Sequence, residues 1–487
     1  MALRATVIGT GYLGATHAAC LAESGLDVLG VDSDVEKVGL LASGAAPFFE
    51  PGLAELIKRH VATGRLRFTT SYEDAADFGD VHFICVGTPQ RADGLAADVS
   101  HLYSAVDSLA PHLHRPCVIV GKSTVPVGTA EALSARVSMA APAGDDVELA
   151  WNPEFLREGH AVTDSLAPSR IVVGLHSELA AKMLRDVYSV QIEAGVPFLV
   201  MDLATAQLVK TAANAFLATK VSFMNAVADL CDAAGGDVVA LADALGRDER
   251  IGGHYLGAGA GFGGGCLPKD IRALAARAVE LGVEGAAALL GVIDEINSRR
   301  RGQLVMLARL ACGGEVHGWR IGVLGAAFKA RSDDVRDSPA LNVAAELHRQ
   351  GALVTVYDPA ALANAETAFP ALGYASSAME AASGAHLVMH LTDWEEFQAL
   401  DPDALGSVTA RRYLVDGRNA LDPQRWREAG WTFRALGRPD DDRSTSMSAP
   451  APVPAWEPRD GEFPPGVAVL PTQRRPEEAA FMDEEVG

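Results

Sequence analysis

A glycine-rich turn near the N-terminus, set between a β-branched run and a helical pattern, narrows the possible folds more than any other part of the sequence. The turn GTGYLG occupies residues 9–14, after the run at 5–8 and before the helical pattern at 15–24. Spaced glycines here allow a tight turn, close approach of a pyrophosphate, and packing of the helix on the strand. Asp32 ends the next apolar run, where an acid accepts hydrogen bonds from ribose hydroxyls. The pattern predicts a Rossmann domain that binds NAD; a glycine-rich structural turn is the alternative.

Short apolar runs alternate with helical patterns through the first 200 residues, which is typical of βαβ units on a parallel sheet. Residues 204–230 contain no Gly or Pro and carry apolar residues at helical spacing. A strand–turn–helix pattern returns at 318–325, followed by an apolar run at 352–358. We therefore expect an α/β fold of two Rossmann-like, doubly wound parallel-sheet domains, joined by a long central helix and a helical region.

The expected division is a Rossmann domain at 1–200, a helical domain at 201–312, a second Rossmann-like domain at 313–437 and a tail at 438–487. From residue 439 onward the chain has nine of its 25 prolines, and eleven acidic residues against four basic ones. This segment has no helical or strand period, so we expect it to be disordered. We also expect its removal after about Gly437 to leave turnover intact.

The composition excludes several classes of function. The chain has 487 residues, and 63 Asp and Glu against 41 Lys and Arg give a formal net charge of −22. This balance argues against nucleic acid or an anionic membrane as a main partner. No stretch approaches the roughly 18 uninterrupted apolar residues of a membrane span. The six cysteines have no paired spacing, so we expect no disulfide framework, no metal and a cytoplasmic location.

The second glycine turn, at 322–329, departs from the first because it has no third spaced glycine and places Lys329 near the start of the next helix. We therefore expect no second dinucleotide site. Lys329, with Arg331 and Arg336, could bind the phosphates of another nucleotide. A solvated basic turn is an equally good interpretation.

Residues 261–270, GFGGGCLPKD, are the most informative segment for chemistry. Pro268 suits the first turn of a helix, so Cys266 is expected just before a helix N-terminus. The positive helix end and Lys269 are expected to lower the pKa of the thiol, as a nucleophile requires. The preceding glycines leave room for a ligand. The other five cysteines lie in apolar strands or in helices, where a structural role is expected.

Two further polar groups are candidates for the same chemistry. Lys210 and Asn214 lie four residues apart in the long helical run, so they share one face and could stabilise an oxyanion. A solvent-facing pair is the alternative. Glu154 and Glu158 follow a strand-like run, and one of them could serve as a base, although surface acids are common.

Taken in order, these segments resemble the UDP-glucose/GDP-mannose dehydrogenase family of nucleotide-sugar 6-dehydrogenases, over about residues 1–437. The motifs that carry the resemblance are GTGYLG at 9–14, VGTP at 86–89, STVP at 123–126, NPEFL at 152–156, Lys210 with 212–214, the Cys266 segment, FK at 328–329 and DGR at 416–418. Gly265 is a departure, since many relatives carry serine there, and we expect it to be harmless.

The resemblance implies an enzyme whose first domain binds NAD, whose last domain binds a UDP-sugar and whose central helical region forms a homodimer. Residues implied to bind NAD are Gly9, Gly11, Leu13, Gly14, Asp32, Lys37, Thr88, Thr124, Glu158, Lys269 and Arg336. Residues implied to bind or flank the substrate are Glu154, Phe155, Leu156, Lys210, Asn214, Arg250, Tyr255, Gly259, Gly263, Lys329 and Arg418. Arg250 is implied to reach the neighbouring subunit's active site.

The implied activity is a four-electron oxidation of UDP-glucose to UDP-glucuronate that consumes two NAD. Cys266 is implied to form a thiohemiacetal and then a thioester, while Lys210 and Asn214 stabilise the oxyanions. Asp270 with Thr124 would position water and shuttle protons, and Glu154 would assist hydrolysis. The stretch CLPKDIR at 266–272 is also similar to GDP-mannose dehydrogenases, so GDP-mannose or another nucleotide sugar is the alternative substrate.

Two other functions compete with this interpretation. A catalytically silent NAD-binding regulator would recruit a partner through its acidic tail, but it would need neither Cys266 nor Lys210, Asn214 and Asp270. A two-electron hydroxyacid dehydrogenase would share the first glycine turn and the long helix. It has no use for a nucleophilic cysteine.

Overall fold

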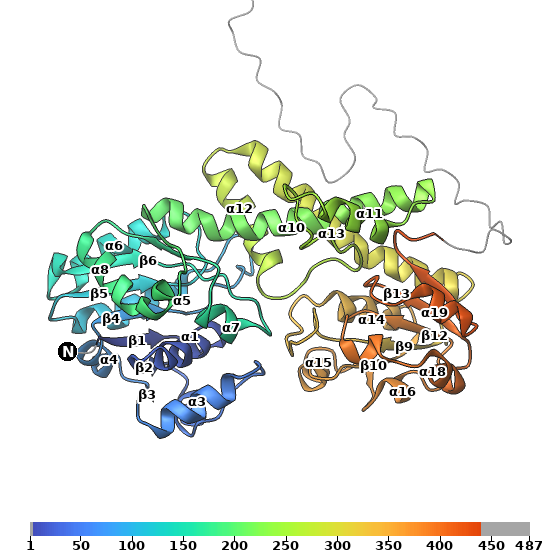
Figure 1. Cartoon of the computed structure of the whole chain (residues 1–487), viewed down its shortest axis with the longest axis horizontal. Helices are drawn as coiled ribbons and strands as arrows, with labels where there is room; N and C mark the ends of the chain where they lie inside the picture. The colour runs from blue at the N-terminus through green and yellow to red at the C-terminus, as the bar shows by residue number, and fades with distance from the viewer. Residues whose placement is uncertain (1–2, 440–487) are drawn as a thin grey trace, which may run out of the picture. The chain divides into compact units, whose positions relative to one another are not determined.

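A computed structural model describes residues 3–439, so the disorder expected for the tail beyond Pro439 lies outside the described residues. The first Rossmann domain has an eight-stranded sheet in the order β3-β2-β1-β4-β5-β6-β7-β8 (Figure 1). Its strands are β1 Arg4–Ile8, β2 Asp27–Val31, β3 Leu66–Thr69, β4 Val81–Ile84, β5 Cys117–Gly121, β6 Val147–Trp151, β7 Ile171–Gly174 and β8 Phe198–Met201.

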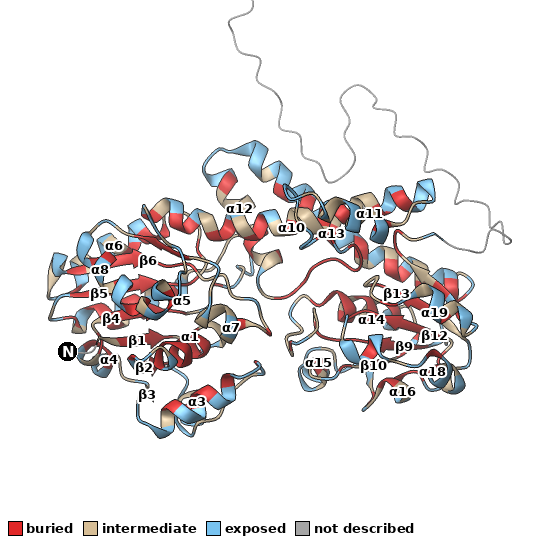
Figure 2. Cartoon of the chain, in the orientation of Figure 1, coloured by how far each residue is buried: buried red, intermediate tan, exposed pale blue. Residues whose placement is uncertain are grey.

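Helices cover both faces of this sheet, as the alternating pattern predicted. They are α1 Tyr12–Glu23, α2 Val35–Ala42, α3 Leu53–Ala62, α4 Tyr72–Phe78, α5 Ser100–Leu109, α6 Thr129–Ala140, α7 Ala161–Leu166, α8 Glu178–Val187 and α9 Ser189–Glu193, with 3-10 turns at Ala110–His112 and Gly144–Asp146. The buried strand runs form the core between these layers (Figure 2).

The sheet departs from the expected parallel arrangement at one place, because β7 pairs antiparallel with β6 through Trp151 and Gly174. Antiparallel neighbours need no crossover helix from one end of the sheet to the other. Residues 152–170 therefore stay at the carboxyl end of β6, which is the end where open α/β sheets bind their ligands.

Four helices follow: α10 Leu203–Ala234, α11 Val238–Gly246, α12 Leu267–Glu280 and α13 Glu284–Ala311. The long run expected from Ala204 to Leu230 is thus one helix, α10, which begins at the capping side chain of Asp202 and ends at Gly235. α10 packs on β7 and α6 of the first domain, and α13 packs on α10, α12 and the second domain. These helices connect the two Rossmann domains (Figure 1).

The second Rossmann domain has a parallel six-stranded sheet in the order β11-β10-β9-β12-β13-β14. Its strands are β9 Arg320–Leu324, β10 Leu353–Tyr357, β11 Gly373–Tyr374, β12 Leu387–His390, β13 Tyr413–Asp416 and β14 Thr432–Ala435. Its helices are α14 Pro339–Arg349, α15 Leu362–Ala368, α16 Ala378–Ala381, α17 Glu395–Gln398, α18 Pro402–Val408 and α19 Pro423–Glu428. The expected architecture of two sheet domains and a helical middle is confirmed. Across residues 3–439, no helix has the length and apolar character to cross a membrane.

Candidate active site

The first glycine turn leaves an open helix start at the carboxyl end of β1. Gly9 has φ +87°, and a Cβ on Gly14 would collide with the carbonyl oxygen of Gly9, so both positions require glycine. A Cβ on Gly11 would meet no atom within 4 Å. Gly11 caps α1 without a side-chain hydrogen bond, and the first turn of the helix has no acidic residue. The open space and free N–H groups fit the pyrophosphate of a dinucleotide.

Asp32 lies beside this turn, where the sequence placed it. Its Oδ2 accepts hydrogen bonds from the Thr10 N–H at 2.8 Å and from Lys37 Nζ at 3.1 Å, while Oδ1 accepts from the Asp34 N–H at 3.1 Å. Burial opposes ionisation of Asp32, but these donors outweigh it and lower the pKa of the carboxyl. The ionised carboxylate is the form that accepts hydrogen bonds from the ribose hydroxyls.

The second glycine turn offers no equivalent opening. The Asp358 carboxylate accepts the N–H groups of both Ala326 and Ala327, at 2.8 and 3.0 Å, and the indole N–H of Trp394. The expectation that Lys329 lies near the start of a helix is wrong, because a loop follows β9 and the next helix, α14, begins at Pro339. In this loop the N–H groups of Ala326 and Ala327 are already bound by Asp358. The second turn therefore differs from the first in that an acidic side chain of its own domain occupies its backbone donors.

A cavity of about 970 Å3 lies at the carboxyl end of the first sheet. Elements from all three parts of the chain contribute to its wall. Its lining includes the predicted site residues Glu154, Phe155, Leu156, Glu158, Lys210, Asn214, Tyr255, Gly263, Cys266, Lys329 and Arg418. The sequence therefore identified residues that the fold brings together from segments more than 250 positions apart.

Two buried polar pairs connect α10 with the neighbouring loops. Lys210 Nζ lies 2.8 Å from Glu154 Oε1, and Asn214 Nδ2 donates to Asp270 Oδ2 at 2.7 Å. Lys210 and Asn214 are 4% and 8% exposed, so the solvent-facing alternative is wrong. Because Lys210 and Asn214 are one helical turn apart, one face of α10 presents a cation and an amide to the cavity.

The Lys210–Glu154 pair is held in its charged form. Burial opposes the charge on both groups. For Glu154 the Lys210 ammonium, the Leu156 N–H and the more distant Lys122 outweigh burial and lower the pKa. For Lys210 the charge of Glu154 is the largest favourable interaction and raises the pKa. The cavity therefore contains an ionised carboxylate and an ammonium beside Cys266.

Cys266 caps the N-terminus of α12, as predicted, and it is exposed to the cavity while the other five cysteines are buried. The prediction that its thiol pKa is lowered is wrong. The thiol has surface open to the cavity, but the surrounding cavity walls keep it from bulk solvent. This loss of solvation and the charges of Glu154 and Asp270 raise the pKa of Cys266 to about 12, although Lys210 opposes this. Lys269, which was expected to help, is instead paired with Asp270 at 2.7 Å.

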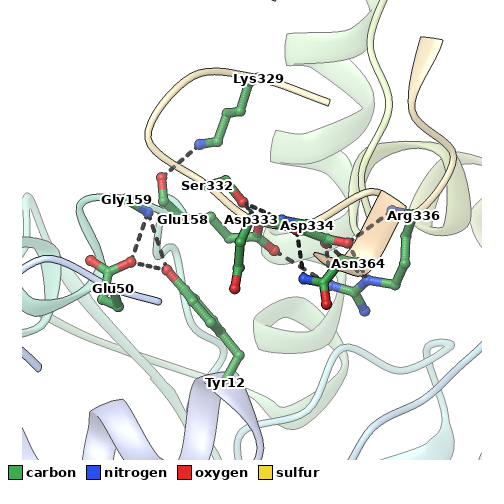
Figure 3. Close-up of polar contacts among 10 residues, drawn as sticks. All are labelled: Tyr12, Glu50, Glu158, Gly159, Lys329, Ser332, Asp333, Asp334, Arg336 and Asn364. Atoms are coloured by element: carbon green, nitrogen blue, oxygen red, sulfur yellow. Dashed lines mark hydrogen bonds and ion pairs between the residues drawn. The ribbon is translucent and has the colours of Figure 1, made fainter. Parts of the chain in front are cut away.

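Glu158 lies where the two Rossmann domains meet (Figure 3). Lys329 Nζ donates to its carbonyl oxygen at 2.7 Å, and the Ser332 hydroxyl donates to Oε2 at 3.1 Å. Burial and the nearby Asp334 raise the pKa of Glu158 to about 7, against the opposing charge of Arg336. Lys329 and Arg336 thus contact the first domain, while Arg331 pairs with Glu395. The solvated-turn interpretation therefore does not describe Lys329.

The remaining predicted cofactor residues lie at the strand ends. Thr88 Oγ1 donates to the carbonyl oxygen of Thr124 at 2.7 Å, which joins the loops after β4 and β5. Thr124 lines a small hollow together with Lys269 and Asp270. Leu13 is the second residue of α1 and lies partly buried.

Two predicted substrate residues lie outside the cavity. The Arg250 side chain is 88% exposed and pairs with Asp248. A Cβ on Gly259 would collide with the carbonyl oxygen of Gly417, so this glycine permits close packing of two loops. Arg418 does line the cavity, but its guanidinium donates to the carbonyl oxygens of Leu391, Gly261 and Phe328 and holds three loops together.

The structure adds residues that the sequence reasoning missed. Tyr12 and Glu50 are hydrogen-bonded to each other, and Glu50 accepts the Gly159 N–H at 2.7 Å (Figure 3). Lys122 lies buried in the cavity wall. Its position directly before the STVP motif was the available signal, since a lysine that follows an apolar strand run needs a partner.

Comparisons with known proteins show the family of the chain. Three domain models of the UDP-glucose/GDP-mannose dehydrogenase family match in order: the NAD binding domain over residues 3–192, the central domain over 204–299 and the UDP binding domain over 322–423. A UDP-glucose 6-dehydrogenase of Rhizobium meliloti is 40% identical, over 90% of this chain and 100% of its own. One of Bacillus subtilis is 38% identical, over 89% of this chain and 97% of its own.

Solved structures of nucleotide-sugar dehydrogenases have a similar fold. A UDP-glucose dehydrogenase from Pyrobaculum islandicum superposes with a TM-score of 0.83 at 37% identity, covering 90% of this chain and 98% of that one. A UDP-D-ManNAc dehydrogenase from Pyrococcus horikoshii gives 0.79 at 28% identity, covering 90% and 100%.

The open glycine turn with Asp32, beside a cavity with an accessible cysteine, is the arrangement of an NAD-dependent dehydrogenase. The three matched domain models narrow this class to one family. The chain belongs to the UDP-glucose/GDP-mannose dehydrogenase family, and NAD is its cofactor. The resemblance found in the sequence motifs is confirmed.

Proposed function

We propose that this chain oxidises UDP-glucose to UDP-glucuronate and consumes two NAD and one water per sugar. NAD, when bound, accepts one hydride in each of the two oxidations. The observation that carries the proposal is the convergence of Cys266, Lys210, Glu154 and Asn214 on one cavity. Relatives named UDP-glucose 6-dehydrogenase support UDP-glucose as the substrate.

The residues of the cavity fit two successive oxidations. The first converts the alcohol to an aldehyde, which has no hydride to give until a nucleophile adds. The Cys266 sulfur bonds to the aldehyde carbon and the thiol proton passes to the former carbonyl oxygen, which gives a thiohemiacetal. The second oxidation removes that proton and the hydride on the same carbon, which leaves a thioester. The Lys210 ammonium and the Asn214 amide stabilise the negative oxygen at each stage.

Hydrolysis of the thioester releases the product. Glu154 is the ionised carboxylate beside Cys266, so it is the group that accepts the proton of the attacking water. Asp270, held by Asn214 and Lys269, and Thr124 would position water and transfer protons. The glycine turn, Asp32, Thr88 and the Glu158–Arg336 contact would bind NAD, and Lys329 with Tyr255 would bind the UDP-sugar.

The first test is the yield of NADH per limiting UDP-glucose, with GDP-mannose in parallel. We expect two NADH per UDP-glucose for the native chain. Cys266→Ser should lose turnover by at least a hundredfold, because it removes the sulfur nucleophile. Turnover with GDP-mannose but not with UDP-glucose would make GDP-mannose the substrate. No NADH with either sugar nucleotide would refute the proposal.

We also propose that the protein works as a homodimer with Arg250 reaching the neighbouring active site. Phe216, Phe223 and Leu230 lie seven residues apart on α10 and are 66%, 57% and 67% exposed. An apolar stripe of this kind on one helix face is a typical interface. Arg250 is exposed and therefore free to meet a second copy.

Mixing two inactive variants tests this dimer. If Arg250 completes the partner's site, Arg250→Ala and Cys266→Ser subunits should each have low activity. A mixture should recover up to about a quarter of native turnover, because half of the subunits fall in mixed dimers with one intact site each. Light scattering should give twice the chain mass. A monomer, or a mixture with no recovery, would contradict the proposal.

We further propose a cytoplasmic location. All six cysteines are unpaired, and five of them are buried. Free thiols in such number fit a reducing compartment. Fractionation of cells that produce the chain would test this.

A further inference from the structure

Lys122 is a buried cation whose role the reaction outlined above leaves open. It follows β5 and is 7% exposed in the wall of the same cavity as Cys266. Its Nζ donates to Asn152 Oδ1 at 2.9 Å and to the Tyr188 hydroxyl at 3.4 Å. Within residues 3–439 it forms no ion pair, so both of its hydrogen-bond partners are neutral. A buried charge without a direct ion pair costs free energy of folding, so a lysine at this position points to a use.

The groups that face Lys122 come from five segments of the chain. Cys85 after β4, His17 of α1 and Tyr188 after α8 are neutral near pH 7, because burial raises the pKa values of the thiol and the phenol and lowers that of the imidazole. Glu154 and Lys210 are the charged groups that face it. Burial lowers the pKa of Lys122 to about 8, so most of it is still protonated at neutral pH.

Asn152 connects Lys122 with the segment that carries Glu154. It also accepts the Tyr188 hydroxyl at 2.5 Å and donates to the carbonyl oxygen of Val172 at 2.7 Å. Asn152 is thus fixed by three contacts, two residues before Glu154 in the chain. The cavity on this side is also polar, because His17 Nε2 and Gln191 Oε1 line it without protein partners, as groups that hold water do.

We propose that Lys122 is a positioning residue for thioester hydrolysis: its ammonium favours the ionised form of Glu154 and, through Asn152, fixes the turn that carries it. In that step the water oxygen bonds to the thioester carbon and Glu154 takes one water proton. The carbon–sulfur bond breaks with its electron pair on Cys266, which regains that proton. The inference rests on the proposed function, since it assigns a role within the hydrolytic half of that reaction.

Loss of the Lys122 charge should affect the hydrolysis of the thioester and leave the two oxidations unaffected. Without the cation, both hydride transfers proceed, but Glu154 is a poorer and less well-placed base for water. The variant Lys122→Met removes the charge at nearly constant volume and leaves Asn152 Oδ1 with its Tyr188 donor. The matched control is Lys182→Met, which removes a lysine charge from an exposed position on α8.

The experiment is rapid mixing of enzyme with excess UDP-glucose and NAD. We expect Lys122→Met to form a burst of about two NADH per active site within twofold of the native rate. Its steady-state turnover should then fall at least tenfold, with the thioester on Cys266 detected by mass spectrometry of quenched enzyme. The acid limb of its steady-state pH profile should move to higher pH, because loss of the cation raises the pKa of Glu154.

Two outcomes would overturn the inference. One is a burst and a steady state that fall by the same factor, as a general structural defect would cause; the other is native turnover in Lys122→Met. Its melting temperature should equal or exceed the native value, because an unpaired buried charge has been removed. If that variant does not fold, Lys122→Gln undergoes the same measurement. Failure of the native chain to yield two NADH per UDP-glucose would refute the proposed function instead.

Discussion

At the scale of single residues, burial decides the chemistry of Cys266 more than its place at a helix start does. The helix end favours a thiolate. The carboxylates of Glu154 and Asp270 and the loss of solvent favour the thiol and raise the pKa to about 12. The cysteine is therefore held mainly as a thiol in the free enzyme. In the proposed reaction, the aldehyde is the electrophile that this thiol attacks beside the Lys210 ammonium. Such a thiol resists adventitious alkylation and oxidation.

Alkylation kinetics test this statement about Cys266. At pH 8 we expect iodoacetamide to label it at least about a hundredfold more slowly than a free cysteine, since the thiolate fraction falls tenfold per pKa unit. The rate should rise through pH 10 without a plateau. We expect the label on Cys266, because it is exposed and the other five cysteines are buried. Peptide mass spectrometry locates the labelled cysteine. Cys266→Ser is the blank, and a plateau below pH 8 would contradict the raised pKa.

At the scale of elements, the glycine turns that follow β1 and β9 show how a similar sequence pattern acquires different uses. In the first, a Cβ on Gly14 would collide with backbone, whereas a Cβ on Gly11 would point into open space. In the second, Asp358 fills the corresponding space by binding two N–H groups. The first turn is thus specialised for a ligand, and the second for holding its own domain together.

Two single substitutions separate packing from cofactor binding in that turn. Gly14→Ala should lower the melting temperature by several degrees and abolish NAD binding, because α1 must move away from Gly9; a backbone clash costs about 1–3 kcal/mol. Gly11→Ala should melt within about 1 °C of the native chain, yet raise the Kd for NAD at least tenfold. Thermal unfolding and calorimetry measure both. Equal loss of stability in the two variants would contradict the assignment.

The elements themselves were predictable because periodicity and turn residues are local signals. The glycine turn, the α10 run and the helix start after Cys266 follow from neighbours within a few positions. The antiparallel β7 was not predictable, since the direction of a strand depends on where its connection leads. The prediction of a lowered pKa for Cys266 was wrong because the fold buries the thiol and brings Glu154, 112 positions earlier in the chain, close to it. Lys122 had a local signal in its place before the STVP motif, but its partners Asn152 and Tyr188 are distant in the sequence.

At the scale of the whole molecule, the contact between the two Rossmann domains is built on one short segment. Glu158 accepts a hydrogen bond from Lys329 at its backbone carbonyl oxygen and another from Ser332 at its carboxylate. A Cβ on Gly159 would lie 2.5 Å from the carbonyl oxygen of Arg331, so the backbones approach closely there. Figure 3 shows Lys329 and Ser332 of the second domain beside Glu158 of the first. Glu158 and Lys329 also line the cavity that Cys266 lines. Because burial and Asp334 raise the pKa of Glu158 to about 7, we expect the stability of this contact to depend on pH.

The pH dependence of stability tests this coupling. The pKa of Glu158 in the fold, about 7, is above its ordinary value of 4.5, so the fold favours the protonated carboxyl. The stability from this preference is fully present below about pH 4.5 and is lost as pH rises through about 7. Glu158→Gln mimics the neutral form and does not suffer that loss. Between pH 5 and 8 the native chain should therefore lose roughly 1–3 kcal/mol relative to this variant.

The measurement is thermal unfolding of both chains without NAD at pH 5 and pH 8, with Glu366→Gln as a control at an exposed position of α15. The difference in melting temperature between Glu158→Gln and the native chain should grow with pH, and that of the control should stay constant. Parallel pH profiles for all three chains would contradict a buried, proton-holding carboxyl. If the difference grows and the Km for UDP-glucose of the native chain also rises with pH, the same ionisation loosens the domain contact during turnover, because substrate is bound from the second domain.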